Sequence, residues 1–118
     1  MDTLELNKKI ETYRKHIQEL LKQRASIKST NPDIETQLVF DTERDHYQII
    51  NTGWRGENKR LYGCSVHVDI KDGKIWVQHD GSEIAIADQL AELGVPKQDI
   101  VLAYHSPMMR QYTEFAVG

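Results

Sequence analysis

The chain has 118 residues, 39% hydrophobic and 28% charged, which predicts one folded domain over residues 1–118. A net charge of −3 argues against a protein whose main task is to grip phosphate backbones, and no apolar run reaches the roughly 20 residues of a membrane-spanning helix. A single cysteine, Cys64, and a first segment without an apolar block predict a cytoplasmic protein without a disulfide or signal peptide.

Charge is distributed unevenly along the chain. Residues 1–30 contain seven Lys or Arg and four Asp or Glu, whereas the remainder contains eight against fourteen. One interpretation is that Lys8, Lys9, Arg14 and Lys15 contact nucleic acid or an acidic partner. The simpler interpretation is a helix that has one apolar stripe and solvates its other faces with basic side chains.

The first expected element is a helix over residues 3–28, within an N-terminal segment 1–30. Asp2 and Glu5 are expected to cap its start, and Pro32 limits its end. Such a helix is about 38 Å long, whereas a compact domain of this size is roughly 30–35 Å wide. Its apolar stripe therefore packs either on the chain's own sheet or partly on a second chain. The stripe consists of Leu6, Ile10, Tyr13, Ile17, Leu20 and Ile27.

Strands are expected over residues 37–42 and 46–51, joined by the turn 43–45 and followed by a loop with Gly53 and Gly56. From Arg60 to Ile70 the residues alternate, which is typical of a strand with one buried face. The residues expected on that buried face are Tyr62, Cys64, Val66, Val68 and Ile70.

A tight hairpin is predicted at Asp72-Gly73, because a two-residue type I′ turn needs positive φ at both positions. The register that places aliphatic pairs together on one face is the expected one. Its pairs are Lys71–Lys74, Ile70–Ile75, Asp69–Trp76, Val68–Val77, His67–Gln78 and Val66–His79.

The remaining elements are a second helix and two strands. Ser82 is expected to cap a helix that runs to Leu93 and is closed by Gly94. Residues 99–104 are expected to form a buried strand, 105–111 a loop and 112–117 a short last strand. The helix residues expected to face inward are Ile84, Ala87, Leu90 and Ala91. This order predicts an α+β fold, with the long N-terminal helix and the second helix packed on a mainly antiparallel β-sheet.

The polar face of the predicted hairpin contains His67 and Asp69, with Trp76 and Gln78 opposite. A His and a carboxylate two residues apart can share a metal ion or a proton. A metal site normally needs three protein ligands; His46, Asp41 or Glu43 could come close enough in the fold to supply the third, but the sequence alone does not place them. A solvated sheet face is the simpler interpretation, so we assign no catalytic, cofactor-binding or metal-ligating residue.

One alternative is a metal-dependent nuclease. The triplet Asp69-Ile70-Lys71 is similar to the acid and lysine that PD-(D/E)xK nucleases place on a strand, with Asp41 as the upstream acid. The triplet is too short to be specific, and its lysine lies at the edge of a tight turn.

Several residues are candidates for a contact surface rather than for chemistry. Trp54 lies among glycines, where an aromatic side chain either anchors a partner or inserts into the core. Arg110 and Tyr112 follow two methionines, a combination that suits an adaptable interface. The full set of candidate contact residues is Trp54, His67, Asp69, Trp76, Arg110 and Tyr112.

Four blocks of the sequence, taken in order, resemble the XisI family, the fdxN-element excision controlling factors. They are "LVFDTERDHYQIINTGW", "RLYGCSVHVDIKDGKIWVQHDG", "LAELGVPKQDIVLAYHSP" and "RQYTEFAV", and the resemblance spans residues 4 to 117. One departure is Ser82 where Thr is expected, and either hydroxyl can cap a helix. The motif positions within these blocks are Gly53, Trp54, Gly63, His67, Asp69, Trp76, Arg110 and Thr113.

The resemblance implies a role in controlling site-specific DNA excision, alongside a recombinase and a companion factor that itself looks nuclease-like. The family occurs mostly in cyanobacteria, and its founding members act during heterocyst differentiation. No catalytic residue is carried over from the family. We therefore expect a non-enzymatic control factor that forms a homo-oligomer or a complex with the companion excision factor and contacts DNA at most indirectly. The nuclease and direct DNA binding by the N-terminal helix are the alternatives.

Overall fold

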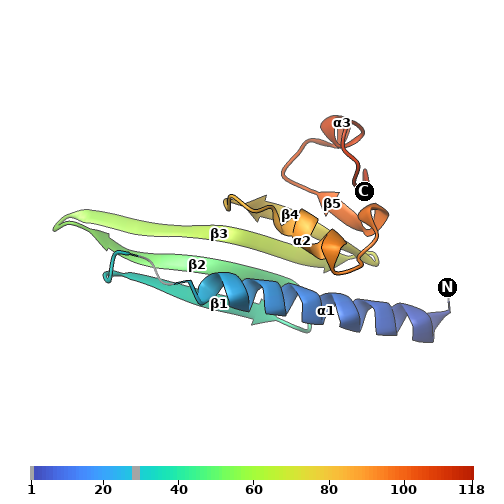
Figure 1. Cartoon of the computed structure of the whole chain (residues 1–118), viewed down its shortest axis with the longest axis horizontal. Helices are drawn as coiled ribbons and strands as arrows, with labels where there is room; N and C mark the ends of the chain where they lie inside the picture. Colours follow the sequence, from blue (N-terminus) through green and yellow to red (C-terminus); the bar gives the residue numbers. More distant parts are fainter. Residues whose placement is uncertain (1, 28–29) are drawn as a thin grey trace.

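The structure is a computed structural model, and it describes residues 2–27 and 30–118. Its helices are α1 (Thr3–Ala25), α2 (Ile86–Glu92) and α3 (Pro107–Arg110), with a 3-10 turn, η1, at Lys97–Asp99. Its strands are β1 (Ile34–Asp41), β2 (His46–Arg55), β3 (Lys59–Lys71), β4 (Lys74–Asp80) and β5 (Ile100–Leu102). The strands form one sheet in the order β1-β2-β3-β4-β5, antiparallel except for the parallel β4–β5 pair. The expected α+β fold is confirmed (Figure 1).

Helix α1 starts as expected and ends three residues early. The Asp2 carboxylate accepts a hydrogen bond from the Glu5 backbone N–H at 2.8 Å, which satisfies one of the free donors of the first turn. Beyond Ala25, the Ser26 hydroxyl bonds the Gln23 carbonyl oxygen, and Ile27 lies outside the helix and is 75% exposed. A small polar residue that bonds the preceding turn competes with helix propagation, which accounts for the earlier end.

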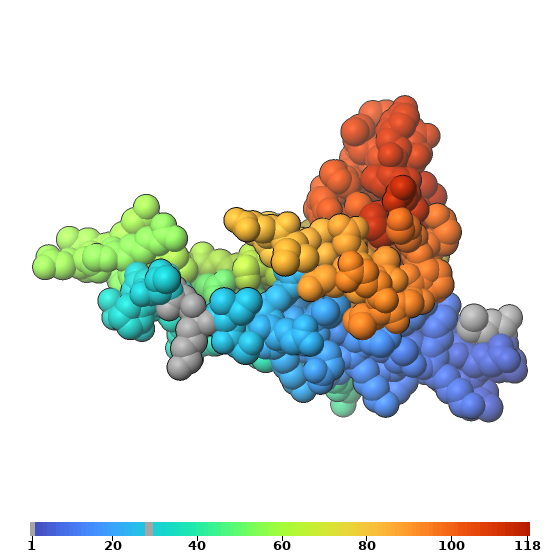
Figure 2. Space-filling view, in the orientation of Figure 1, coloured from blue at the N-terminus to red at the C-terminus, as the bar shows by residue number. Residues whose placement is uncertain are grey.

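The core lies between one face of the sheet and the two longer helices. Figure 2 shows α1 and α2 side by side in front of the sheet, with the β2–β3 hairpin projecting past them. The middle of the α1 stripe packs on the chain's own sheet, where Tyr13, Ile17 and Leu20 are buried, and Leu21 joins them. Side chains from α2, the residue Val95 that follows it, and four strands complete this core: Tyr47, Ile49, Val66, Val68, Ile70, Ile75, Val77, Ile86, Ala87, Leu90, Val95, Ile100 and Leu102.

The molecule is elongated, and this corrects the width expected for a compact domain. Its principal extents are 55 × 31 × 24 Å. The long β2–β3 hairpin extends the sheet along the direction of α1, a helix of 23 residues whose middle packs on that sheet. The N-terminal turns of α1 extend past the ends of the strands (Figure 1), where Leu4 and Leu6 are 63% and 37% exposed.

Two glycines expected in a loop lie in or next to this hairpin. Strand β2 continues to Arg55, so Gly53 is a buried strand residue that pairs with Ile34, and the turn is confined to residues 56–58. A Cβ at Gly53 would lie 2.1 Å from the Asp33 carbonyl oxygen. The close approach of that backbone explains why a glycine stands inside a strand.

The facing of β3 differs from the prediction because the strand contains a bulge. Ile49 pairs with Val66, but Ile50 pairs with Cys64, so Ser65 is an extra residue in β3. An extra residue moves the following side chains to the other face. Cys64 and Tyr62 therefore lie opposite the core, and Tyr62 is 74% exposed.

The β3–β4 hairpin confirms most of the predicted register. Asp72 and Gly73 have φ values of 54° and 75°, as a type I′ turn requires. The first four predicted pairs, from Lys71–Lys74 to Val68–Val77, are present. The last two are wrong: a bulge at Gln78 makes His67 pair with His79 and Val66 with Asp80.

The C-terminal third departs most from expectation. Helix α2 begins at Ile86 rather than after Ser82, because the Asp80 carboxylate accepts the hydrogen bond of the Ile86 N–H at 2.8 Å. Ile84, expected inward, is 66% exposed and precedes the helix, whereas Gly94 does close it with a φ of 99°.

Two further segments are corrected. Strand β5 is shorter than expected, and the expected loop contains the short helix α3, which Ser106 caps and Pro107 starts. Residues 112–117 do not form a strand; they contribute one bridge, between Val101 and Ala116. Within the described parts of the chain, no helix is both long enough and apolar enough to cross a bilayer.

Candidate functional site

The sheet has one face under the helices and a second face that the strand register defines. Paired residues share a face, so the partners of Asp69, His67 and Cys64 on β2 lie on the second face with them. We call this surface the open face, because each of its residues is half-buried or exposed. The residues that these pairings place on it include Val39, His46, Gln48, Ile50, Trp54, Tyr62, Cys64, His67, Asp69 and Trp76.

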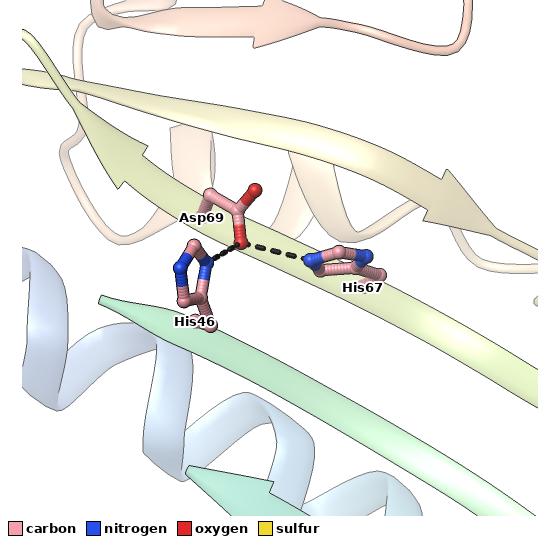
Figure 3. A group of neighbouring side chains, drawn as sticks. All are labelled: His46, His67 and Asp69. Carbon is pink, nitrogen blue, oxygen red and sulfur yellow. Dashed lines mark hydrogen bonds and ion pairs between the residues drawn. The ribbon is translucent and has the colours of Figure 1, made fainter. Parts of the chain in front are cut away.

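A polar cluster of three residues occupies one end of the open face (Figure 3). His46, the first residue of β2, pairs with Asp69 of β3, and His67 precedes Asp69 by two residues. The Oδ1 atom of Asp69 accepts hydrogen bonds from His46 Nδ1 and His67 Nε2, both at 2.8 Å. The sequence placed His67 and Asp69 together; the β2–β3 register adds His46.

The surroundings of the cluster favour the protonated form of the His46 imidazole. The hydrogen bond to Asp69, reinforced by the charge of that carboxylate, raises the pKa of His46 above its ordinary value of 6.5. The second oxygen of Asp69 accepts a hydrogen bond from Gln78 Nε2 at 3.2 Å. The side chains of His46, His67 and Asp69 are 52%, 30% and 15% exposed, so the cluster is open to solvent on one side.

Trp76, the predicted partner of Asp69, packs against the C-terminal segment of the chain. The Lys71 ammonium lies 3.9 Å from the centre of the Trp76 ring, and the Arg110 guanidinium carbon lies 5.5 Å from it. Arg110 also donates to the carbonyl oxygens of His105 and Ala103, at 3.0 and 3.4 Å. Trp76 and Arg110 therefore hold residues 103–118 against β4.

Three other candidate positions have clear placements. Trp54 is 45% exposed with the Arg60 guanidinium 5.4 Å from its ring centre, so its insertion into the core is excluded. Tyr112 is 75% exposed. Thr113 has a structural role, because its hydroxyl bonds the Arg110 carbonyl and accepts from the Phe115 N–H.

Cys64 lies half-buried on the open face, with its thiol 3.1 Å from the Val66 carbonyl oxygen. Burial raises the pKa of this thiol, so little of it is ionised at neutral pH. The environment is that of an inert cysteine rather than of a nucleophile.

The residues of the nuclease alternative are engaged elsewhere. The Asp41 carboxylate accepts hydrogen bonds from the Glu43 and Arg44 backbone at 3.0 and 2.9 Å, and these bonds hold its pKa below the ordinary value. Asp41 lies on β1, two strands away from Asp69. Lys71 lies on the Trp76 ring. The structure thus brings Asp69 to His46 and His67 rather than to Asp41 and Lys71.

Three basic side chains of α1 form ion pairs with acids from the rest of the chain. Arg14 binds the Asp45 carboxylate through two nitrogens, at 2.7 and 3.0 Å. Lys9 lies 3.3 Å from Asp99, which also accepts the Tyr13 hydroxyl. These ion pairs tie the helix to the β1–β2 turn and to η1.

A third ion pair anchors the end of α1. Arg24 lies 3.6 Å from Asp80 and also bonds the Ser82 hydroxyl and the Ile84 carbonyl. Sequence reasoning missed this role of Arg24 and Asp80, because the two residues are far apart in the chain. The only signal in the sequence was that residues 1–30 and the remainder carry net charges of opposite sign.

An elongated sheet with α1 and α2 on one face and exposed aromatic and polar residues of β2 and β3 on the other defines a small α+β protein. The chain belongs to the XisI family, because the family model described as XisI protein matches residues 7–117. Among curated proteins, none matches the chain.

Two solved structures are similar over nearly the whole chain. A XisI-like protein from Anabaena variabilis ATCC 29413 is 46% identical, with a TM-score of 0.85 over 91% of this chain and 97% of that one. The fdxN element excision controlling factor XisI from the same strain is 35% identical, with a TM-score of 0.82 over 93% of this chain and 99% of that one.

Proposed function

We propose that this chain is a non-enzymatic control factor for site-specific DNA excision, and that it acts through protein contacts made by the open face. Membership of the XisI family and the name of the solved relative that is 35% identical support the excision role. The observation that carries the contact role is the exposure of Tyr62 and Trp54, 74% and 45%, on the sheet face opposite α1 and α2. Aromatic side chains on a rigid strand are the residues that protein partners bury at binding hot spots.

Charge favours a protein partner over direct DNA binding. Of the four basic residues that would contact DNA, Lys9 and Arg14 are held by Asp99 and Asp45. These pairs neutralise part of the positive segment within the molecule, and the net charge remains −3. A protein that binds DNA mainly through phosphates needs several free cations on one surface.

The proposed partner is the companion excision factor, through which the chain contacts DNA indirectly. Burying the exposed parts of Val39, Trp54 and Tyr62 in an interface favours association by several kcal/mol, at about 25 cal/mol per Å² of apolar surface, before the entropic cost of association. Interface cores are enriched in Trp and Tyr, which is the composition seen here.

The test is sedimentation velocity of the purified chain, alone and mixed with the purified companion factor. The proposal expects a complex with the wild type and its loss in Tyr62→Glu. The matched control is Ile84→Glu, an exposed apolar residue that lies outside the open face. A chain that sediments as a monomer and leaves the companion factor unchanged would contradict the proposal. A duplex DNA that binds the chain alone with a steep salt dependence would replace it with direct DNA binding.

A further inference from the structure

The cluster at the end of the open face brings together three groups that ligate metals. His46 Nδ1, His67 Nε2 and an Asp69 carboxylate oxygen lie within 4.8 Å of one another. From this geometry we infer that His46, His67 and Asp69 form a binding site for a divalent transition-metal ion of the zinc class. Two imidazoles and one carboxylate make a common three-ligand zinc set that leaves one coordination position open.

The spacing of the three groups suits an ion of this size. Ligand atoms around tetrahedral zinc, at about 2.0–2.2 Å from the metal, lie roughly 3.4 Å apart. The Asp69 oxygen is now 2.8 Å from each imidazole nitrogen, as the hydrogen bonds require. An ion that replaces the shared protons therefore needs each oxygen–nitrogen distance to grow by about 0.6 Å, and it needs the two imidazole nitrogens, which lie within 4.8 Å of one another, to approach by at most about 1.4 Å. The exposed imidazoles have room for this movement, since His46 and His67 are 52% and 30% exposed.

The strands fix the positions from which the ligands project. His46 and Asp69 are direct partners in the antiparallel β2–β3 ladder, and His67 is on the same strand and face as Asp69. The three backbones are therefore positioned before any ion binds, which lowers the entropic cost of binding.

The neighbour of the cluster orients the carboxylate. Gln78 Nε2 donates to the Asp69 Oδ2 atom at 3.2 Å. The Oδ1 atom stays directed at the two histidines (Figure 3). Partners of this kind orient metal ligands and commonly change affinity by about tenfold or more. Gln78 is the bulge residue of β4, two residues beyond Trp76, the direct partner of Asp69.

The chemistry of the donors sets the class of ion. Imidazole nitrogens favour Zn²⁺, Co²⁺, Ni²⁺ and Cu²⁺, whereas Mg²⁺ and Ca²⁺ prefer sites made of oxygen. The coordination positions that the protein leaves free face solvent on the open face, where water or a side chain of a partner protein fills them. The site thus supplies a metal-bridged contact in addition to the apolar contact of the proposed function.

The test uses the full chain without a histidine tag. Titration with Zn²⁺ against a chromophoric chelator, and the visible absorption of bound Co²⁺, should each report one ion per chain. His67→Ala and Asp69→Asn should raise the Kd for Zn²⁺ by at least about tenfold, and His16→Ala, a histidine on α1, should leave it unchanged. Circular dichroism confirms that each variant is folded.

A second readout does not depend on any variant. In ¹H–¹⁵N spectra of the imidazole rings, Zn²⁺ should shift the His46 and His67 signals and leave His16 in place. Absence of saturable Zn²⁺ binding, or equal binding by wild type and His67→Ala, would overturn the inference. Tight Mg²⁺ binding at the same residues would overturn the assigned class of ion. Sedimentation in the presence of EDTA tests the proposed protein contacts separately, so either proposal can fail without the other.

Discussion

Replacement of Asp80 tests how much its contacts with α1 and α2 contribute to the stability of the fold. The Asp80 side chain is 7% exposed and connects three elements at the end of β4. It accepts hydrogen bonds from the Ile86 N–H at 2.8 Å and the Ser82 N–H at 3.0 Å, and it lies 3.6 Å from the Arg24 guanidinium. Asp80→Ala leaves the first N–H of α2 and the charge of Arg24 without this acceptor.

The expected cost follows from these contacts. A hydrogen bond to a charged group contributes about 1.5–3 kcal/mol, and loss of a helix cap costs about 1 kcal/mol. Because the freed groups are partly rehydrated, we expect Asp80→Ala to lower the free energy of unfolding by about 2–4 kcal/mol. Asp80→Asn, which keeps one acceptor oxygen, should cost about half as much. The control is Glu83→Gln, an exposed acid three residues away, which should change stability by less than about 0.5 kcal/mol.

The effect should depend on pH with a defined sign. Burial alone raises the pKa of Asp80, but the hydrogen bonds from Ser82 and Ile86 and the charge of Arg24 outweigh it and hold the pKa below 3.8. A carboxyl whose pKa is lower in the folded state stabilises the fold above its unfolded pKa and loses that contribution as pH falls through the folded value. The difference between wild type and Asp80→Asn in urea unfolding should thus be full at pH 6 and shrink below about pH 4. Equal stability of Asp80→Ala and Glu83→Gln at pH 6 would refute this reasoning.

Two further substitutions test the packing of the sheet and the core. Gly53→Ala should lower the free energy of unfolding by about 1–3 kcal/mol, because its Cβ would lie 2.1 Å from the Asp33 carbonyl oxygen. Gly63→Ala, whose Cβ would meet no atom within 4 Å, is the control and should leave stability unchanged. Equal effects of the two substitutions in chemical denaturation would contradict the role of the Asp33 contact. Ile17→Ala should cost about 2–5 kcal/mol, because Ile17 is fully buried between α1 and the sheet, and Ile27→Ala, 75% exposed, should cost little in the same assay. A loss below 1 kcal/mol for Ile17 would contradict the assignment of the α1 stripe to the chain's own core.

The elements predictable from the sequence are those with strong local signals. The Asp72-Gly73 pair favours a tight turn, because both of its residues adopt positive φ. That turn sets the first four residue pairs of the β3–β4 register. The apolar stripe of α1 likewise predicts its buried side at Tyr13 and Ile17.

The errors come from features without a local signal. The bulges at Ser65 and Gln78 each add one residue to a strand, which moved Tyr62 and Cys64 out of the predicted core and changed the partner of His67. No residue type marks such a position, because the cause is the packing of neighbouring strands.

For the same reason, only two of the three residues of the polar cluster could be predicted from the sequence. His67 and Asp69 share a face through their spacing alone, but His46 reaches them through the β2–β3 register, which depends on the length of the hairpin and on the Ser65 bulge. The ion pairs of α1 with Asp45, Asp80 and Asp99 are also long-range, and only the opposite signs of the two parts of the sequence indicated them.

The most direct measurement of the central claim is the affinity of the chain for the purified companion excision factor, determined by sedimentation with and without the open-face substitution Tyr62→Glu. The account predicts a complex that Tyr62→Glu weakens by at least about tenfold and that Ile84→Glu leaves intact, since a central aromatic residue contributes 2 kcal/mol or more at a binding hot spot. Absence of a wild-type complex, or equal weakening by the two substitutions, would contradict it.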